Sequence, residues 1–235
     1  RNNNRYNIII ILKNHSRGLE VWALLDNFTY DVNTKEILSY TSKRAKLIEG
    51  LVNEALALGV DGINVDLEQV SSEAGEDYVE FLRELSISCR ANNLVLSVDN
   101  YVPKNYNAHY DWKEQGKVAD YVIIMGYDEH YGGSQEPGSV ASIGYVEEGI
   151  STMVQSVPSE KVINAVPFYT RIWETSGGEV KSQAVGMSAV QKFLSDRNIE
   201  AVWDEDTCQN YAEVQDGDSF YQVWIEDARS LEVKM

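Results

Sequence analysis

Short apolar runs that alternate with helical patterns constrain the fold of this chain more than any other feature. Five runs are rich in Val, Ile or Leu, which is typical of strands buried on both faces. They lie at residues 19–25, 62–67, 94–98, 121–125 and 162–166. Helical patterns lie at residues 43–58, 76–91, 140–154 and 187–196. This alternation predicts βα units and a parallel sheet.

The number of strands decides between a whole barrel and part of one. A complete (β/α)8 barrel has eight parallel strands in about 250 residues, whereas this chain shows about five. We therefore expect an α/β fold of the (β/α)8 TIM-barrel type that is incomplete at both ends. Because an open sheet exposes its edges, we also expect the open barrel edges to be covered by segments missing from this sequence or by self-association.

Two segments depart from the βα pattern. Residues 8–12 resemble a strand, but only about six residues separate them from Leu19, and a parallel crossover needs about a dozen. We therefore expect a helix there, closed by Gly18. Residues 170–224 contain a Gly-Gly pair, one helical pattern and three β-like pieces, which predicts a small α+β insertion. Residues 1–235 are interpreted as one partial barrel domain with this insertion.

The charge and the apolar pattern exclude two classes of partner. The net charge of −17 at pH 7 gives a surface that repels phosphate groups, so we expect neither nucleic acid nor membrane as a partner. No apolar run is long enough to cross a bilayer, and the first residues show no signal-peptide pattern. Cys89 and Cys208 lack metal-ligand spacing, and the sequence leaves open whether they pair.

Residues 61–68, Asp-Gly-Ile-Asn-Val-Asp-Leu-Glu, are the most informative segment for chemistry. Side chains alternate between the faces of a strand, so Asn64, Asp66 and Glu68 share one face and three apolar residues share the other. The apolar face suits packing against outer helices. The polar face then points into the barrel, near the end of the strands where barrel enzymes place their active sites.

Two carboxylates on one face of a strand cannot both ionise without a penalty. We therefore expect Asp66 or Glu68 to hold a proton near neutral pH, and Glu68, nearest the barrel mouth, is the candidate general acid. The alternatives are a structural Asp and Asn cluster or a bound cation. A calcium loop needs Gly at its sixth position, whereas Gly62 is second, so that loop does not fit. We expect no metal ion and no other cofactor.

The same segment resembles the signature of glycoside hydrolase family 18, which reads Asp-Gly, apolar, Asp or Asn, apolar, Asp, any residue, Glu. Residues 125–128, Met-Gly-Tyr-Asp, resemble the Met-x-Tyr-Asp strand end of this family. Further segments resemble its bacterial branch of spore-cortex and cell-wall N-acetylglucosaminidases. These segments are residues 127–130, 138–144, 167–171 and 224–231. The resemblance extends over residues 19–231.

The resemblance implies substrate-assisted hydrolysis, in which the 2-acetamido oxygen of the substrate attacks the anomeric carbon. By position, Glu68 protonates the departing oxygen and later activates water. Asp66 holds the acetamido N–H and stabilises positive charge, and Tyr127 donates to the acetamido oxygen. Asp128 is implied to contact the sugar, and Asn64 to hydrogen-bond Asp66.

Further sugar contacts are predicted for residues near strand ends, because aromatic rings can stack on the apolar C–H faces of pyranoses. Ordinary packing is the alternative for each ring. The candidates are Asn100, Tyr101, Tyr169, Arg171 and Trp173. Two features depart from the family pattern: Ile123 stands where many members carry Gln, and no last strand supplies a Trp beneath the sugar.

The expected function is cleavage of β-1,4 bonds in a polysaccharide that contains N-acetylglucosamine, either peptidoglycan or chitin. The resemblance also implies a secreted bacterial protein of the cell wall or spore. The alternative is a carbohydrate-binding module of a cell-wall protein with weak or no activity, because the family includes lectins that lost the acid. Glu68 is the position that separates the two interpretations, and it is Glu here.

Overall fold

The computed structural model describes residues 10–28 and 33–235. The chain divides into two units. The first comprises residues 1–124 and 152–163, and the second comprises residues 125–151 and 164–235.

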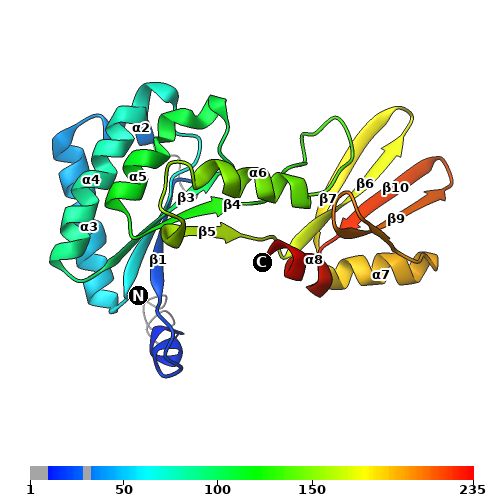
Figure 1. Ribbon diagram of the computed structural model, residues 1–235, viewed down its shortest axis with the longest axis horizontal. Coiled ribbons are helices and arrows are strands. Elements are labelled where there is room, and N and C mark those ends of the chain that lie inside the picture. The colour runs from blue at the N-terminus through cyan, green and yellow to red at the C-terminus, as the bar shows by residue number, and fades with distance from the viewer. Residues whose placement is uncertain (1–9, 29–32) are drawn as a thin grey trace. The chain divides into compact units, whose positions relative to one another are not determined.

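A five-stranded sheet with the order β1-β2-β3-β4-β5 is the centre of the first unit (Figure 1). Its strands are β1 (Trp22–Asp26), β2 (Gly62–Asp66), β3 (Val95–Tyr101), β4 (Tyr121–Met125) and β5 (Val162–Ala165). The pairs β1–β2 and β2–β3 are parallel. The predicted strands and their order are confirmed. Since β1 and β5 stand at the two ends of this order, the sheet is open, as predicted for an incomplete barrel.

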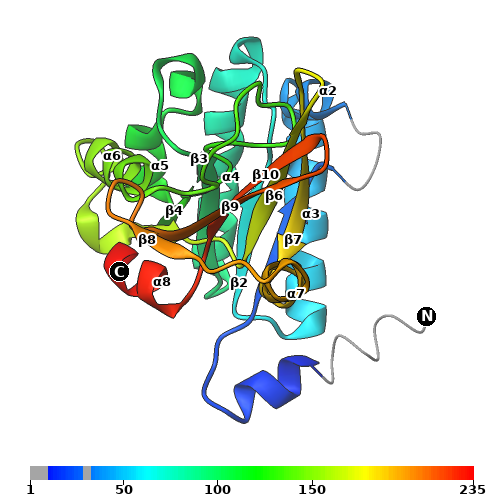
Figure 2. The ribbon, with the colours of Figure 1, turned by 90° about the vertical axis from the view of Figure 1, so that its right-hand side faces the viewer.

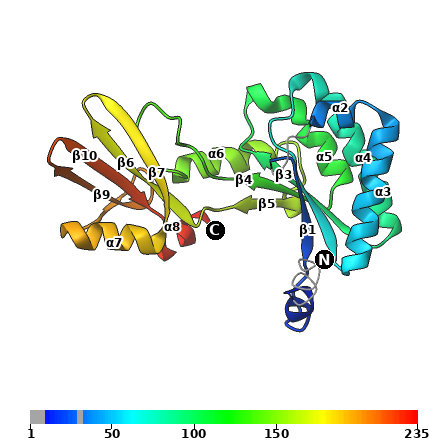
Figure 3. The ribbon, with the colours of Figure 1, turned by 180° about the vertical axis from the view of Figure 1, so that it is seen from behind.

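Helices α3, α4 and α5 lie side by side on one side of this sheet (Figures 1 and 3). The helices of this part of the chain are α2 (Thr34–Leu38), α3 (Thr41–Leu58), α4 (Gly75–Ala91) and α5 (Trp112–Val118). Three short 3-10 helices accompany them: η1 (Ser72–Ala74), η2 (Asn105–Tyr110) and η3 (Ser159–Lys161). The predicted helices at 43–58 and 76–91 are thus confirmed, whereas α2 and α5 were not predicted. Gly59 ends α3 with a φ of 70°, a left-handed conformation that glycine adopts without strain.

Residues 10–15 form a helical turn before β1, as predicted for this segment, while residues 8 and 9 lie outside the described residues. The helix closes at Gly18, whose N–H donates to the carbonyl of His15 at 2.9 Å and whose φ is 73°. The segment is tied to the sheet through Asp61, which bonds His15 at 2.8 Å and accepts from the N–H of Val21 at 2.7 Å.

A second five-stranded sheet, with the order β7-β6-β10-β9-β8, forms most of the second unit. Its strands are β6 (Tyr169–Ser176), β7 (Glu179–Gly186), β8 (Val202–Asp204), β9 (Gln209–Asp216) and β10 (Ser219–Ile225). All four pairs of neighbouring strands in this order are antiparallel. The hairpin between β6 and β7 turns at Gly177 and Gly178, with φ values of 58° and 83°, which is the Gly-Gly turn chemistry that favours a hairpin. Sequence analysis noted this pair but did not predict β6 and β7.

Helix α7 (Met187–Arg197) packs against the antiparallel sheet, and Figure 2 shows it end-on near β7. Val190 and Leu194 of the helix pack with Ala212, Val223 and Ile225 of the strands. The predicted helix at 187–196 is confirmed, and so is the one at 140–154, which is α6 (Ile143–Met153).

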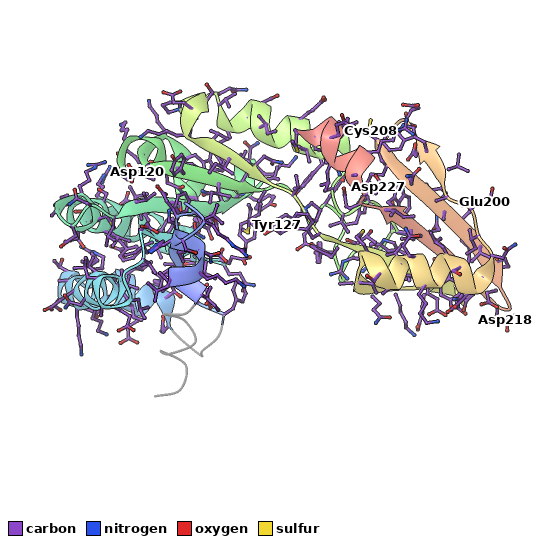
Figure 4. All side chains as sticks on the ribbon, turned by 90° about the horizontal axis from the view of Figure 1, so that it is seen from below. Asp120, Tyr127, Glu200, Cys208, Asp218 and Asp227 are labelled. Carbon is purple, nitrogen blue, oxygen red and sulfur yellow. The ribbon has the colours of Figure 1, made fainter. Side chains whose placement is uncertain are left out.

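The C-terminal helix α8 (Ala228–Lys234) begins at Asp227, whose carboxylate accepts from the N–H of Ser230 at 3.0 Å (Figure 4). Just before it, Glu226 is buried and bonds Lys234, Gln209 and Ser230. The buried ion pair thus links the last turn of α8 to the residue before the helix, and the hydrogen bond from Gln209 fixes that residue to β9.

Both cysteines are free thiols. Cys89 is buried in α4, and burial raises the pKa of its thiol to about 11. Within residues 10–28 and 33–235, no helix has the length and apolar character needed to cross a membrane.

Candidate active site

The alternation of β2 separates an apolar face from a polar one. Ile63 and Val65 are 2% and 0% exposed, whereas Asn64 and Asp66 are only partly buried. In the parallel pairing Asn64 lies opposite Ser97 of β3, and Asp66 lies opposite Asp26 of β1. Partners in register point to the same side of a sheet, so these polar side chains share one face.

Three aspartates form a row across neighbouring strands. Asp26 and Asp66 are register partners, and the pair Val65–Val98 places Asp66 and Asp99 at the next position along β2 and β3. All three stand at or near the C-terminal ends of their strands. We call Asp26, Asp66 and Asp99 the aspartate row.

The amide of Asn64 supports this row from below. Its Nδ2 donates to Asp99 at 2.7 Å, and its Oδ1 accepts from the hydroxyl of Ser97 at 2.6 Å. The bond to Asp66 expected from the family resemblance is thus replaced by one to Asp99, because the side chain turns toward β3.

The electrostatics of the row centre on Asp66. Burial raises the pKa of this carboxyl to about 6, and the charges of Asp99, Glu68 and Asp26 add to the effect. Its Oδ1 is buried and has no hydrogen-bond partner. One of the two carboxyls on this strand was predicted to hold a proton near neutral pH, with Glu68 as the choice, and the raised pKa is found at Asp66.

Asp99 is a second perturbed carboxyl. Burial raises its pKa, with a further contribution from the charge of Glu68, while the hydrogen bond from Asn64 acts in the opposite direction. Its Oδ1 is also buried without a partner, as is the hydroxyl of Tyr78 in α4. Burial raises the pKa of Tyr78 well above its usual value, and the charges of Asp99 and Asp66 contribute.

The main chain of Glu68 is fixed by one side chain. Nδ2 of Asn27 donates to the carbonyl of Glu68 at 2.8 Å, and the N–H of Glu68 donates to Oδ1 of Asn27 at 3.1 Å. The same Nδ2 lies 3.0 Å from the hydroxyl of Thr34 at the start of α2. One amide thus fixes the position of the candidate acid at the end of β2.

Two tyrosines hold the chain immediately beside Glu68. The hydroxyl of Tyr110 donates to the carbonyl of Leu67 at 3.2 Å and accepts from the N–H of Val70 at 3.1 Å. The hydroxyl of Tyr101 accepts from the N–H of Gln69 at 3.3 Å. Burial raises the pKa of Tyr101, and the hydrogen bond to Glu68 raises it further. Gln69 has a φ of 53°, a left-handed conformation that costs free energy outside glycine and persists here through these bonds.

A pocket of about 370 Å³ borders Glu68 within the first unit. Its lining is mostly polar and comes from the ends of β1 and β2 and from α2. The lining residues include Asn27, Phe28, Thr34, Lys35, Gln69 and Ser71. Hydroxyl, amide and ammonium groups beside an aromatic ring suit a polyhydroxylated ligand.

Three of the predicted site residues lie together in the second unit. Tyr127 lies two residues after the end of β4 (Figure 4). Its ring stands edge-on to that of Tyr169, with centroids 6.2 Å apart, and the hydroxyl of Tyr169 donates to Asp128. Asp128 has a φ of 58°, a second left-handed residue at a predicted catalytic strand end. Because Glu68 and Tyr127 belong to different units, their predicted proximity stays a prediction.

Three other predicted sugar contacts have different surroundings. Asn100 is 1% exposed and faces α5, where its amide exchanges two hydrogen bonds with Gln115 at 2.7 and 2.9 Å. Trp173 is 1% exposed and donates to the carbonyl of Gly138 at 2.9 Å. Neither placement fits a sugar contact. Arg171 is partly buried and donates to Ser182 at 3.1 Å.

Sequence reasoning missed Asn27, Asp26 and Asp99. The signal was present, because Asp26 and Asn27 directly follow the predicted strand at 19–25 and Asp99 follows the one at 94–98. Applying the two-residue alternation of strands to Ser97 would have selected Asp99 and Tyr101 and excluded Asn100.

The arrangement places four carboxyl groups and one pocket near the ends of parallel strands. No group of three or more His, Cys, Asp or Glu residues in the described part of the chain is arranged to hold a metal ion. Perturbed carboxyls such as Asp66 and Asp99, near a carboxyl that borders a pocket, are typical of sites that transfer protons.

The comparison with protein families agrees with this chemistry. The model of glycosyl hydrolases family 18 matches residues 2–235. The chain belongs to glycosyl hydrolase family 18. Its fold is therefore the chitinase-type TIM barrel, of which the first unit supplies five strands.

Relatives within family 18 include bacterial proteins of spores. The chain is 29% identical over 206 residues to YdhD of Bacillus subtilis, which is named as a putative sporulation-specific glycosylase. It is 26% identical over 213 residues to the cortical fragment-lytic enzyme of the same organism. These matches cover 85% and 84% of this chain but 49% and 48% of the relatives, so the chain spans about half their length.

Solved structures show the same similarity. The crystal structure of YdhD matches with a TM-score of 0.89 and 26% identity, covering 97% of this chain and 78% of that one. A chitinase from Chromobacterium violaceum matches with a TM-score of 0.84 and 26% identity, covering 95% of this chain and 72% of that one.

Proposed function

We propose that this chain is the catalytic part of a glycosidase that cleaves β-1,4 bonds beside N-acetylglucosamine by substrate-assisted, retaining hydrolysis. The observation that carries the proposal is the end of β2. There Glu68 is fixed through both main-chain polar groups by Asn27, with Asp66 one pleat away and its pKa raised to about 6.

In this proposal Glu68 is first an acid and then a base. The acetamido oxygen of the substrate attacks the anomeric carbon while the bond to the leaving sugar breaks and Glu68 gives its proton to the departing oxygen. Glu68 then removes a proton from water, which opens the oxazolinium ion. Two displacements at the same carbon retain its configuration. Fixing the acid in advance contributes because a general acid must lie within hydrogen-bond reach of the oxygen it protonates.

Asp66 has a different role. Its carboxylate accepts from the acetamido N–H and balances the positive charge of the oxazolinium ion, an interaction that is strong in a site with little water. With a pKa of about 6, Asp66 is mostly ionised at pH 7 and mostly protonated at pH 5. Activity is therefore expected to fall on the acidic side of pH 6.

Tyr127 donates a hydrogen bond to the acetamido oxygen in this scheme, and Asp128 contacts the sugar, as the family resemblance implies. The bond from Tyr169 to Asp128 supports the proposal, because it orients the carboxylate next to the Tyr127 ring. Tyr101, beside Glu68, and Arg171 are the remaining proposed contacts.

Peptidoglycan is the proposed substrate and chitin the second candidate. The name cortical fragment-lytic enzyme supports the first, and the similarity to a chitinase supports the second. A protein acting on peptidoglycan is expected to be secreted to the cell wall or spore. We propose no nucleic-acid or membrane partner, because the net charge of −17 opposes binding to phosphate-rich surfaces.

The test is product analysis with the full protein and its Glu68→Gln variant. Each is incubated with spore peptidoglycan, vegetative peptidoglycan and chitooligosaccharides, and the products are identified by mass spectrometry. We expect new N-acetylglucosamine reducing ends from the wild type and almost none from Glu68→Gln, which keeps its ligand affinity. Binding without cleavage by the wild type would favour the carbohydrate-binding alternative, and full activity of Glu68→Gln would remove the acid assignment.

A further inference from the structure

We infer that Asp99 is a positioning residue for the reaction, which acts through Asp66 by holding a second negative charge beside it on the neighbouring strand. The inference rests on the proposed function, because it concerns how the protonation of Asp66 is controlled. It assigns a role to a residue outside the signature segment at 61–68.

The first support is geometric. β2 and β3 are parallel and in register up to Val65 and Val98, so the next residues, Asp66 and Asp99, lie side by side. Neighbouring strands are about 4.8 Å apart, which places two side chains on the same face within reach of each other's charge. The amide of Asn64 holds Asp99 in this position at 2.7 Å.

The second support is the chemistry of Asn64 itself. The signature position that accepts either Asp or Asn is Asn here, and an amide carries no charge. Both ends of this amide are engaged, since Nδ2 donates to Asp99 and Oδ1 accepts from Ser97. Asn64 therefore orients a carboxylate on β3 rather than supplying one on β2.

The third support is the set of unpartnered polar atoms. Oδ1 of Asp66 and Oδ1 of Asp99 are both buried without a hydrogen-bond partner, and so is the hydroxyl of Tyr78. Buried oxygens left in this way carry the desolvation penalty of an unmade hydrogen bond. A proton bound by Asp66 reduces that penalty by removing one of two adjacent charges.

The titratable groups that face Asp66 come from several elements. Asp26 lies on β1, Glu68 follows β2, and Asp99 lies on β3, all of them acidic. Two phenols complete the surroundings, Tyr78 from α4 and Tyr110 from η2, and their pKa values are raised chiefly by burial. The contribution of Asp99 to the raised pKa of Asp66 is larger than those of Glu68 and Asp26.

The decisive variant is Asp99→Asn, which removes the charge but keeps an oxygen that accepts from Asn64. We expect the acidic limb of the pH profile of kcat/KM to move down by about one pH unit, because a like charge beside Asp66 is lost. Glu49→Gln on the exposed face of α3 makes the same change in net charge far from the row and should leave the profile unchanged. A profile of Asp99→Asn that overlays the wild type would overturn the inference.

A second pair of measurements does not depend on activity. In protein labelled with ¹³C at Asp carboxyls, the resonance lost in Asp66→Asn identifies Asp66. It should titrate near pH 6 in the wild type and lower in Asp99→Asn. The double variant Asn64→Asp, Asp99→Asn moves the carboxylate to β2 and should return the titration toward that of the wild type. If Asp66 titrates identically in all of them, Asp99 has only a structural role.

Two outcomes separate this inference from the proposed function. If Glu68→Gln is fully active, the proposed function fails, whereas the titration of Asp66 still tests Asp99. If Glu68→Gln is inactive and Asp66 does not respond to Asp99→Asn, only the present inference fails. Should Asp99→Asn not fold, Asn64→Asp alone adds a carboxylate next to Asp66 and must raise its titration, and no rise would refute the coupling.

Discussion

Replacing Asn27 by Ala should disable the candidate acid without removing it. The Asn27 amide makes two hydrogen bonds to the main chain of Glu68, at 2.8 and 3.1 Å, and one with Thr34 at 3.0 Å. In Asn27→Ala the main chain of Glu68 can bond water instead, because the site is only partly buried. The effect on folding should therefore be small, whereas the position of the carboxyl is no longer fixed.

The magnitude follows from the two bonds to Glu68. A typical protein hydrogen bond contributes about 0.5–1.5 kcal/mol, so losing both weakens the fixation by about 2 kcal/mol. If this energy is lost from the transition state, kcat falls about 30-fold, since 1.36 kcal/mol corresponds to a factor of ten. KM should change less than kcat, because both ends of the Asn27 amide are already bonded to Glu68 and Thr34.

The assay is steady-state kinetics on the peptidoglycan or chitooligosaccharide that the wild type cleaves, together with urea unfolding of both proteins. Asn27→Asp is the matched control, because it keeps an acceptor for the Glu68 N–H but removes the donor to its carbonyl. We expect an intermediate kcat or a lower one, since the new charge adds to an acidic site. A kcat within twofold of the wild type in Asn27→Ala would refute the idea that this amide positions the acid.

The remaining predictions concern charge and burial. Asp66 has a native pKa near 6 against 3.8 for the free side chain, so the native state holds the proton more tightly. Stability should then fall as pH rises from about 4 to about 6, by about 3 kcal/mol. Urea unfolding at pH 4.5 and 7 should show about 2 kcal/mol of this loss in the wild type but not in Asp66→Asn. An equal change in the free energy of unfolding between the two pH values in both proteins would contradict it. Lys234→Met should destabilise the second unit by about 3–5 kcal/mol in thermal melting, because it leaves the buried Glu226 charge unpaired. Lys234→Met combined with Glu226→Gln should recover most of that loss, and no recovery would mean that packing alone explains it. Tyr127→Phe should reduce kcat less than Asp66→Asn does, because it removes one hydrogen bond worth about 1–3 kcal/mol if left unmet. A larger loss in Tyr127→Phe would reverse that order.

The barrel part of the fold could be predicted from the sequence because its signal is local. Each strand of the first sheet is a short run of Val, Ile or Leu, and α3 ends at a glycine that the pattern marks. The antiparallel sheet was harder. β7 (Glu179–Gly186) is mostly exposed and has the composition of a loop, so its strand character depends on pairing with β6 through the Gly177–Gly178 turn. Pairing partners cannot be read from hydrophobic periodicity when neither face of a strand is buried.

The site shows the same division between local and distant information. Asp66 and Glu68 follow from alternation within one strand. Asn27, by contrast, acts on Glu68 across 41 positions of sequence, and only the parallel register of β1 and β2 brings them together. Asn100, by contrast, was selected as a sugar contact although its side chain turns to Gln115 of α5. Its neighbours Asp99 and Tyr101 are the residues of β3 that point to the site.

The aspartate row raises the question of why a fold would keep three acidic side chains on adjacent strands. Burying such groups opposes folding, and hydrophobic replacements of similar size would be expected to stabilise the sheet. The raised pKa of Asp66 measures part of that penalty, and the bonds from Asn64 and Ser97 offset little of it because they reach Asp99 and Asn64 rather than Asp66. A positively charged oxazolinium ion is the species whose charge the row would match. The same negative charge that opposes folding without substrate therefore stabilises the charged intermediate. A loss of stability in exchange for activity is the expected relation at a site adapted to bind a cation formed during the reaction.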